Sequence, residues 1–236
     1  MGNNLILNNV NSNTITGLLI QNLPPITKPR QRVDIEEIDG RDGDILTPLG
    51  YGAYDKEFQI GLTYNYDINE IIKFFDSEGT VIFSNEPTKY YNYKIVEQID
   101  FERLIRFKTA TVKMHVQPFK YSTTEQPIVR EYGQNDELTV TVRNSGNIYS
   151  KPTITIQGSG DISVFLNNSQ IFEISLGEEE YIVIDVNLME AYKGNTLKNR
   201  LVQGNYENFI LPLGDNTISF TGTVEAIEVK NYSRWI

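Results

Sequence analysis

The chain has 236 residues and a formal net charge of −10, from 31 acidic and 21 basic side chains. That balance excludes a general attraction for nucleic-acid phosphates or anionic lipid, because such binding depends on basic patches. The sequence has no cysteine and one histidine, His115, which excludes disulfides, thiolate nucleophiles and zinc sites built on cysteine or three histidines. No export signal and no apolar run of about 18 residues is present, so we expect a soluble protein without membrane insertion.

Residues 1–120 alternate short apolar runs with turn residues, the pattern of a β-rich domain. We expect a half-buried strand at 33–38 and further strands at 58–64, 81–83, 90–96, 101–110 and 111–116. Strand periodicity puts Val112, Met114 and Val116 on the core face of the last strand, and His115 on the opposite, wet face, where a structural or interface role is expected.

A single helix is predicted in this domain, at about residues 67–78. Asp67 and Glu70 have the spacing of a capping box, in which each side chain accepts from the first turn of the helix. An apolar stripe follows at helical spacing, and Gly79 is expected to end the helix; the stripe consists of Ile68, Ile71, Ile72 and Phe75.

Residues 121–135 are polar and contain proline, so we interpret them as a linker. Residues 136–236 carry short, evenly spaced strand signals, which predict a β-sandwich of jelly-roll or Greek-key type. Tight turns are expected at Asn167–Asn168, at Gly158–Gly160 and at Gly214–Asn216, and residues 187–208 are expected to form a surface loop. The fold class is therefore mainly β: a β-rich domain in α+β style with one helix, then a sandwich.

The stretch from Asp39 to Leu62 opens with alternating aspartates and glycines, which mark sharp turns. Its spacing fails the calcium-loop pattern, since positions 5 and 12 counted from Asp39 are glycines. No helix start follows that could cradle a phosphate. We interpret the stretch as a subunit-contact loop, with the candidate interface residues Asp39, Arg41, Asp42, Asp44, Tyr51 and Tyr54.

The sequence predicts no catalytic residue, no metal ligand and no cofactor site, and we expect a protein that is not an enzyme. Paired carboxylates of the glycosidase kind stay open at this point, because their separation is a three-dimensional quantity.

Two groups of residues carry a family resemblance. Asp39–Gly43, the tyrosine-bearing loop, the capped helix and the turn at Gly79–Thr80 resemble the N-terminal domain of the distal tail proteins of long, non-contractile-tailed bacteriophages. Leu213–Phe220, Gly222 and the end at Tyr232–Trp235 resemble the galectin-like C-terminal domain of the same family.

The resemblance implies a structural virion protein at the phage tail tip, made in the host cytoplasm. Such proteins form a hexameric ring that joins the tail-tube protein to a tail-associated lysin or fibre protein and, in some phages, to receptor-binding proteins. DNA passes through the ring without specific binding, and an acidic lumen would repel its phosphates. The alternatives are a carbohydrate-binding module built on the C-terminal sandwich and a glycan-degrading enzyme.

Overall fold

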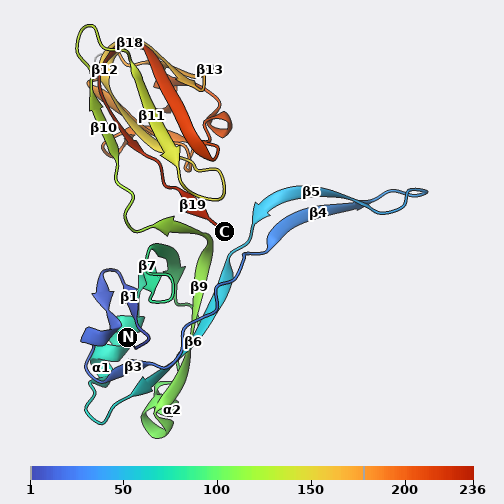
Figure 1. The fold of residues 1–236 in the computed structure, drawn as a ribbon, viewed down its shortest axis with the longest axis vertical. Helices are drawn as coiled ribbons and strands as arrows, with labels where there is room; N and C mark the ends of the chain where they lie inside the picture. The colour runs from blue at the N-terminus through green and yellow to red at the C-terminus, as the bar shows by residue number, and fades with distance from the viewer. Residues whose placement is uncertain (1, 178) are drawn as a thin grey trace. The chain divides into compact units, whose positions relative to one another are not determined.

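The computed structural model describes residues 2–177 and 179–236, and strands dominate each of its two units (Figure 1). Unit 1 comprises residues 2–123 and Ile236, and unit 2 comprises residues 124–235. The mainly β class predicted from the sequence is confirmed. No helix in the described residues is long and apolar enough to cross a membrane.

Unit 1 is built on an antiparallel sheet with the strand order β2-β1-β7-β8-β9-β6-β3. The strands are β1 (Leu5–Leu7), β2 (Val10–Asn11), β3 (Leu18–Ile20), β6 (Tyr54–Leu62), β7 (Glu78–Phe83), β8 (Lys89–Lys94) and β9 (Thr109–Ser122), with a 3-10 turn at Ser12–Thr14. One face of the sheet forms the core. As predicted for β9, Val112, Met114 and Val116 are buried there.

Helix α1 (Ile68–Phe75) packs on this core face through Ile71, Phe74 and Phe75. The Asp67 side chain accepts from the backbone N–H groups of Asn69 and Glu70, so the predicted N-cap is confirmed. The rest of the helix differs from the prediction. Glu70 accepts from the backbone of Thr16 and does not reach back to Asp67, Ile72 is exposed, and the helix ends at Phe75, well before Gly79.

A second helix, α2 (Phe101–Phe107), occupies residues where a strand was predicted. The Asp100 carboxylate accepts from the backbone N–H of Arg103 at 2.8 Å and caps its first turn. Lys108 then takes a left-handed conformation with φ 58°, which ends the helix and starts β9.

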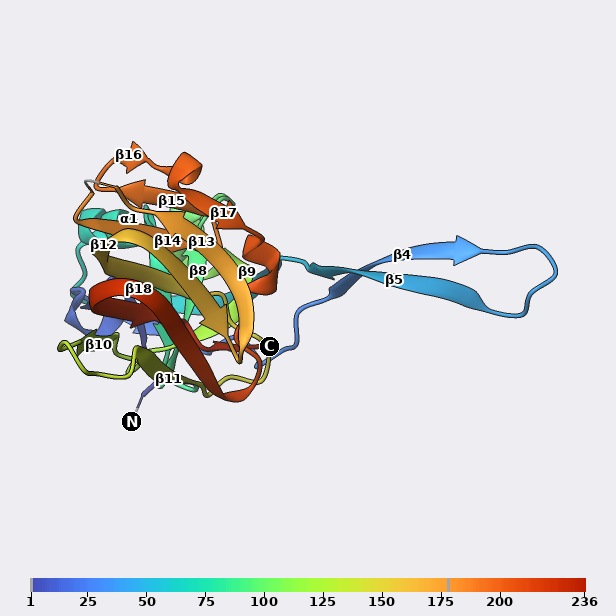
Figure 2. The same cartoon turned by 90° about the horizontal axis from the view of Figure 1, so that it is seen from above.

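Strands β4 (Gln31–Glu37) and β5 (Asp44–Tyr51) pair only with each other (Figure 2). They form a two-stranded hairpin, and all of β4 is exposed. The strand predicted at 33–38 is present as β4, but its predicted half-burial is wrong, because no other part of the described chain covers it. The stretch predicted as a loop is a turn at residues 38–43 followed by β5 and β6.

Unit 2 folds around two long strands, β12 (Thr153–Leu166) and β18 (Gly214–Lys230), which pair along most of their length. One half of this pair continues through β14 (Tyr181–Asp185), β15 (Glu190–Lys193) and β16 (Thr196–Leu197), and carries β10 (Ile128–Glu131) on its other side. The other half adds β11 (Thr139–Asn144), β13 (Ser169–Ser175) and β17 (Val202–Gly204). Short 3-10 turns at Asn199–Leu201 and Tyr206–Asn208 and strand β19 (Arg234–Trp235) complete the unit.

Several local predictions in unit 2 are corrected by this pairing. The predicted turns at Gly158–Gly160 and Gly214–Asn216 lie within β12 and β18, and the predicted loop at 187–208 contains three strands. The predicted linker contains β10, which pairs with β18. The turn at Asn167–Asn168 is confirmed, with φ of 50° and 71° between β12 and β13.

Candidate functional site

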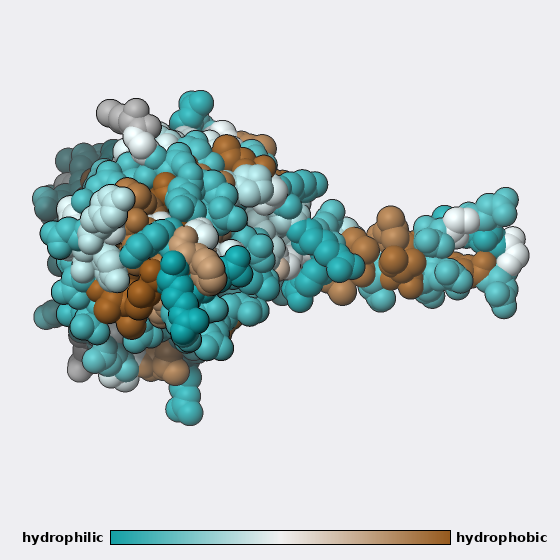
Figure 3. Space-filling model, turned by 90° about the horizontal axis from the view of Figure 1, so that it is seen from below, coloured by the Kyte–Doolittle hydropathy of each residue, from teal (hydrophilic) through white to brown (hydrophobic). Residues whose placement is uncertain are grey.

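The β4–β5 hairpin is the most unusual element of the chain, because its apolar side chains have no cover within the described residues. Cross-strand pairing puts Val33 opposite Pro48 and Ile35 opposite Leu46, so these four side chains share one face of the hairpin. Ile35 and Leu46 are 56% and 59% exposed. Figure 3 shows the resulting apolar band along the middle of the hairpin. We call these four residues the hairpin face.

Carboxylates surround the hairpin face. Glu37 pairs with Asp44 at the distal end of the same face, while the opposite face carries Asp34, Glu36 and Thr47 beside the half-buried Ile45. Residues 31–51 contain six acidic and two basic side chains, a formal charge of −4. None of these carboxylates forms an ion pair among the described residues, so the hairpin presents an apolar strip ringed by free negative charge.

The base of the hairpin is fastened to unit 1 by contacts from both of its legs. Gly52 N–H donates to the Arg30 carbonyl at 2.9 Å, which holds the two legs together. Lys56 Nζ donates to the Pro25 carbonyl at 2.9 Å, and the Tyr51 ring lies edge-on to the Phe119 ring at 5.7 Å.

Lys56 lies in a buried cage at this base. It is 3% exposed, and its ammonium lies 4.8 Å from the centre of the Tyr91 ring. Burial lowers the pKa of Lys56 to about 8, while the negative charge of Glu86 opposes that shift. Glu86 also binds Lys120 at 2.9 Å and accepts from the Tyr91 hydroxyl at 2.5 Å. Burial raises the pKa of Tyr91, so its hydroxyl keeps the proton that it donates.

The predicted site residues fall into two separate groups. Asp39, Arg41 and Asp42 lie in the tip turn and Asp44 begins β5, whereas Tyr51 and Tyr54 lie at the base. The prediction missed the hairpin face, although its signal is present as alternating apolar residues on either side of an aspartate- and glycine-rich turn. The role of the six predicted site residues as subunit contacts stays a prediction.

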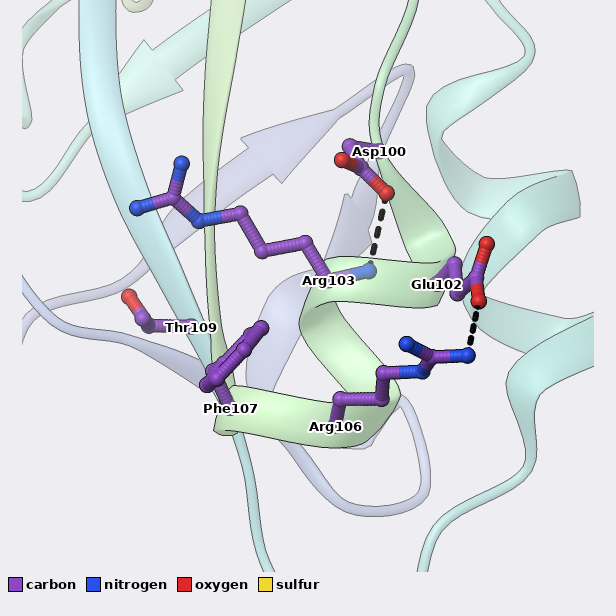
Figure 4. Close-up of a pocket in the computed structure, with 6 residues that line it drawn as sticks. All are labelled: Asp100, Glu102, Arg103, Arg106, Phe107 and Thr109. Carbon is purple, nitrogen blue, oxygen red and sulfur yellow. Dashed lines mark hydrogen bonds and ion pairs between the residues drawn. The ribbon is translucent and has the colours of Figure 1, made fainter.

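A second exposed feature lies at the end of α2, where side chains border a hollow of about 640 Å³ (Figure 4). Phe107 is 71% exposed, and the guanidinium of Arg103 has no hydrogen-bond or ion-pair partner in the described part of the chain. Arg106 pairs with Glu102 one helical turn earlier. The hollow is lined by Asp100, Glu102, Arg103, Arg106, Phe107 and Thr109.

His115 lies on the exposed face of the unit 1 sheet, as its strand position predicted. Its Nδ1 is 2.8 Å from Asp55, which also pairs with Lys113 at 3.1 Å. These two partners hold the pKa of the Asp55 carboxyl below its usual value. The described residues contain no cluster of histidine, aspartate and glutamate that could hold a metal ion. No serine or threonine hydroxyl in the described part of the chain bonds to His115.

Known structures resemble this arrangement over nearly the whole chain. The Dit protein of phage SPP1 matches with a TM-score of 0.64 over 98% of this chain and 100% of that chain, at 14% sequence identity. The chain has the fold of a Dit protein. The SPP1 Dit protein is described as a paradigm of hub adsorption apparatus in phages that infect Gram-positive bacteria.

More distant matches come from baseplates. A chain of the phage P2 baseplate, in its activated conformation with calcium, matches at a TM-score of 0.48 and 11% sequence identity over 100% of both chains. A chain of the activated baseplate with strontium matches at a TM-score of 0.46 and 12% identity over 98% of both chains. No protein-family model matches the sequence, and no curated protein does. The similarity to the Dit fold thus lies in the structure, at a sequence identity that carries the fold alone.

Proposed function

We propose that the protein is a structural hub of a phage tail tip, which assembles into a hexameric ring through its N-terminal unit. The observation that carries the proposal is the uncovered hairpin face on a chain with the Dit fold. An isolated two-stranded hairpin is marginally stable in water, and complete burial of an exposed Ile or Leu side chain contributes up to about 1.5–3 kcal/mol. A neighbouring subunit that covers the face supplies this stabilisation.

The ring would join the tail-tube protein on one side to a tail-associated lysin or fibre protein on the other. Unit 2 would carry receptor-binding proteins. The chain's formal charge of −10 supports a lumen that repels DNA and lets it pass. His115, the one histidine, pairs with Asp55 and with no hydroxyl of the described residues, which favours a structural role over turnover of a substrate.

Sugar binding by unit 2 is the weaker candidate. Its open groove of about 440 Å³ has one aromatic ring, Phe172, which is 1% exposed and so presents no face for stacking on a sugar. Glycan-array binding by the whole protein, lost on changes in this groove, would establish sugar binding by unit 2. The groove is lined by Gln170, Ile171, Phe172, Glu173, Gln203 and Gly204.

Mass photometry and negative-stain imaging of the purified chain test the hub directly. We expect rings of six subunits in the wild type and monomers in the Ile35→Ser/Leu46→Ser variant, with an unchanged melting temperature because both side chains are exposed. The matched control is Leu188→Ser/Leu197→Ser, two equally exposed leucines of unit 2, which should leave the rings intact. A wild type that stays monomeric at every concentration would overturn the proposal.

A further inference from the structure

The end of α2 exposes side chains that do not contribute to the core of unit 1. Leu104 supplies the buried contact of this short helix, and the left-handed turn at Lys108 leaves Phe107 pointing outward. Arg103 and Phe107 are one helical turn apart and share a side of the helix, whereas the guanidinium of Arg106 extends toward Glu102 (Figure 4). We call Arg103, Arg106 and Phe107 the α2 surface. An exposed aromatic flanked by arginines is the composition of a contact site, since these residue types dominate interface energetics.

The hairpin face has the complementary chemistry. Its apolar strip ends at the cross-strand pair Glu37 and Asp44, both exposed and both without ion-pair partners among the described residues. Two carboxylates beyond an apolar strip match the free guanidinium of Arg103 and that of Arg106 beside a phenyl ring. Arg106 is paired with Glu102, but both side chains are exposed, and such a pair contributes too little stability to prevent contact with a carboxylate of a partner. Arginine binds a carboxylate through two parallel hydrogen bonds, which fixes orientation as well as attraction.

The two surfaces lie at opposite ends of the same strand pair. The hairpin enters β6 at Tyr54, which is opposite Val116 of β9, whereas α2 enters β9 at Thr109, which is opposite Gly61 of β6. Seven residue steps separate these ends, about 23 Å along the strands. One copy therefore offers its hairpin at one end and its α2 surface at the other, the arrangement that a head-to-tail interface needs in order to close a ring.

Other basic groups of unit 1 fit less well. Lys120 is buried beside Glu86, and Lys113 is bound by two carboxylates, those of Asp55 and Glu97. Lys28 and Arg30 belong to the leg of the hairpin itself. Among the exposed cations of the described residues, Arg103 combines a free guanidinium with an exposed aromatic neighbour.

We propose that the α2 surface of one subunit receives the hairpin of the next, with Phe107 on Ile35 and Leu46 and with Arg103 and Arg106 on Glu37 and Asp44. This inference rests on the ring proposed above and names its two contacting surfaces. The partner is a second copy of this chain, selected by opposite charge around an apolar centre.

A charge-swap experiment tests the contact. In mass photometry, Arg103→Glu/Arg106→Glu and Glu37→Arg/Asp44→Arg should each weaken ring assembly by about 100-fold, because each puts like charges together. Mixing the two variants, or combining all four changes in one chain, should recover most of the lost affinity. If a variant failed to assemble because it misfolded, the complementary variant would not restore its assembly.

Two controls share the chemistry and lack the position. Asp34→Arg/Glu36→Arg reverses carboxylates on the opposite face of the hairpin, and Arg143→Glu/Arg200→Glu reverses exposed arginines of unit 2; both should assemble within about 3-fold of the wild type. Rings from wild type and from Arg103→Glu/Arg106→Glu alike would overturn this contact and leave the proposed function standing. A monomeric wild type would overturn both.

Discussion

Lys56 is a charged residue at a position of β6 whose side chain points into the core. It shares the inward parity of Phe58 and Ile60 on β6, so the sequence places it on the core face. Only the fold shows that Tyr91 and the Pro25 carbonyl receive its ammonium. A buried ammonium is disfavoured relative to water, which is why its pKa falls to about 8.

Lys56 should make the stability of the protein depend on pH. Its pKa is lower in the folded chain than in the unfolded chain, so the unfolded chain binds more protons above pH 8, and the free energy of unfolding rises with pH there. Relative to Lys56→Met, the wild type should gain about 2 kcal/mol between pH 7 and pH 9.5. Urea unfolding of both proteins at several pH values measures this difference.

The Met variant also serves as the control, because it keeps the tyrosines whose raised pKa acts in the same alkaline range, Tyr54 and Tyr91. Parallel stability profiles for the two proteins would show that Lys56 keeps its ordinary pKa in the folded state.

At the scale of elements, the sequence of α2 contains both helix signals and strand signals, and its apolar residues led to the wrong prediction of a strand. Asp100 precedes a run with Glu102 and Arg106 at helical spacing, which are features of a helix start and of an i,i+4 ion pair. Phe101, Ile105 and Phe107 also fall at strand spacing, which favours a strand when those charges are left out. In short apolar runs the capping residue is the better guide, because it specifies the backbone direction directly.

In the β12–β18 pair, glycines that the sequence suggests are turns lie within continuous strands. Pairing shifts register twice between Gln157 and Ser163, and Gly158 and Gly222 lie at these irregularities. Any side chain there would collide with the facing backbone: a Cβ on Gly158 would lie 2.2 Å from the Thr223 carbonyl oxygen. The glycines thus allow two long strands to approach closely where their register shifts.

Gly222→Ala should destabilise unit 2 much more than Gly160→Ala. Both glycines have positive φ, 96° and 72°, but a Cβ at Gly222 meets the Asp161 carbonyl oxygen at 2.2 Å, whereas one at Gly160 meets open space. We expect a loss of about 1 kcal/mol for Gly160→Ala from backbone strain alone, and more than about 3 kcal/mol for Gly222→Ala. Chemical denaturation measures both, and equal losses would contradict close strand approach as the cause.

At the scale of the whole molecule, the hairpin should be separable from folding. Its ends are already joined by the hydrogen bond from Gly52 to Arg30, and its apolar residues belong to neither core. Replacing residues 32–50 with two glycines, which keeps Tyr51 on Phe119, should therefore keep the melting temperature within about 3 °C of the wild type and abolish assembly. Calorimetry and mass photometry on the same sample check both outcomes. A large fall in melting temperature would show that the hairpin stabilises its own unit.

The sequence by itself determined the mainly β class, the inward and outward faces of β9, the N-cap of α1 and the acidic turn at residues 39–44. These features depend on residues close together in the chain, whose side chains fix local backbone geometry and periodicity. The tertiary structure alone decided that β12 and β18 run unbroken past their glycines and that the strand at 33–38 has no cover. Which surface covers a strand depends on contacts between residues that are distant in the chain, and for the hairpin the residues that the structure describes provide none.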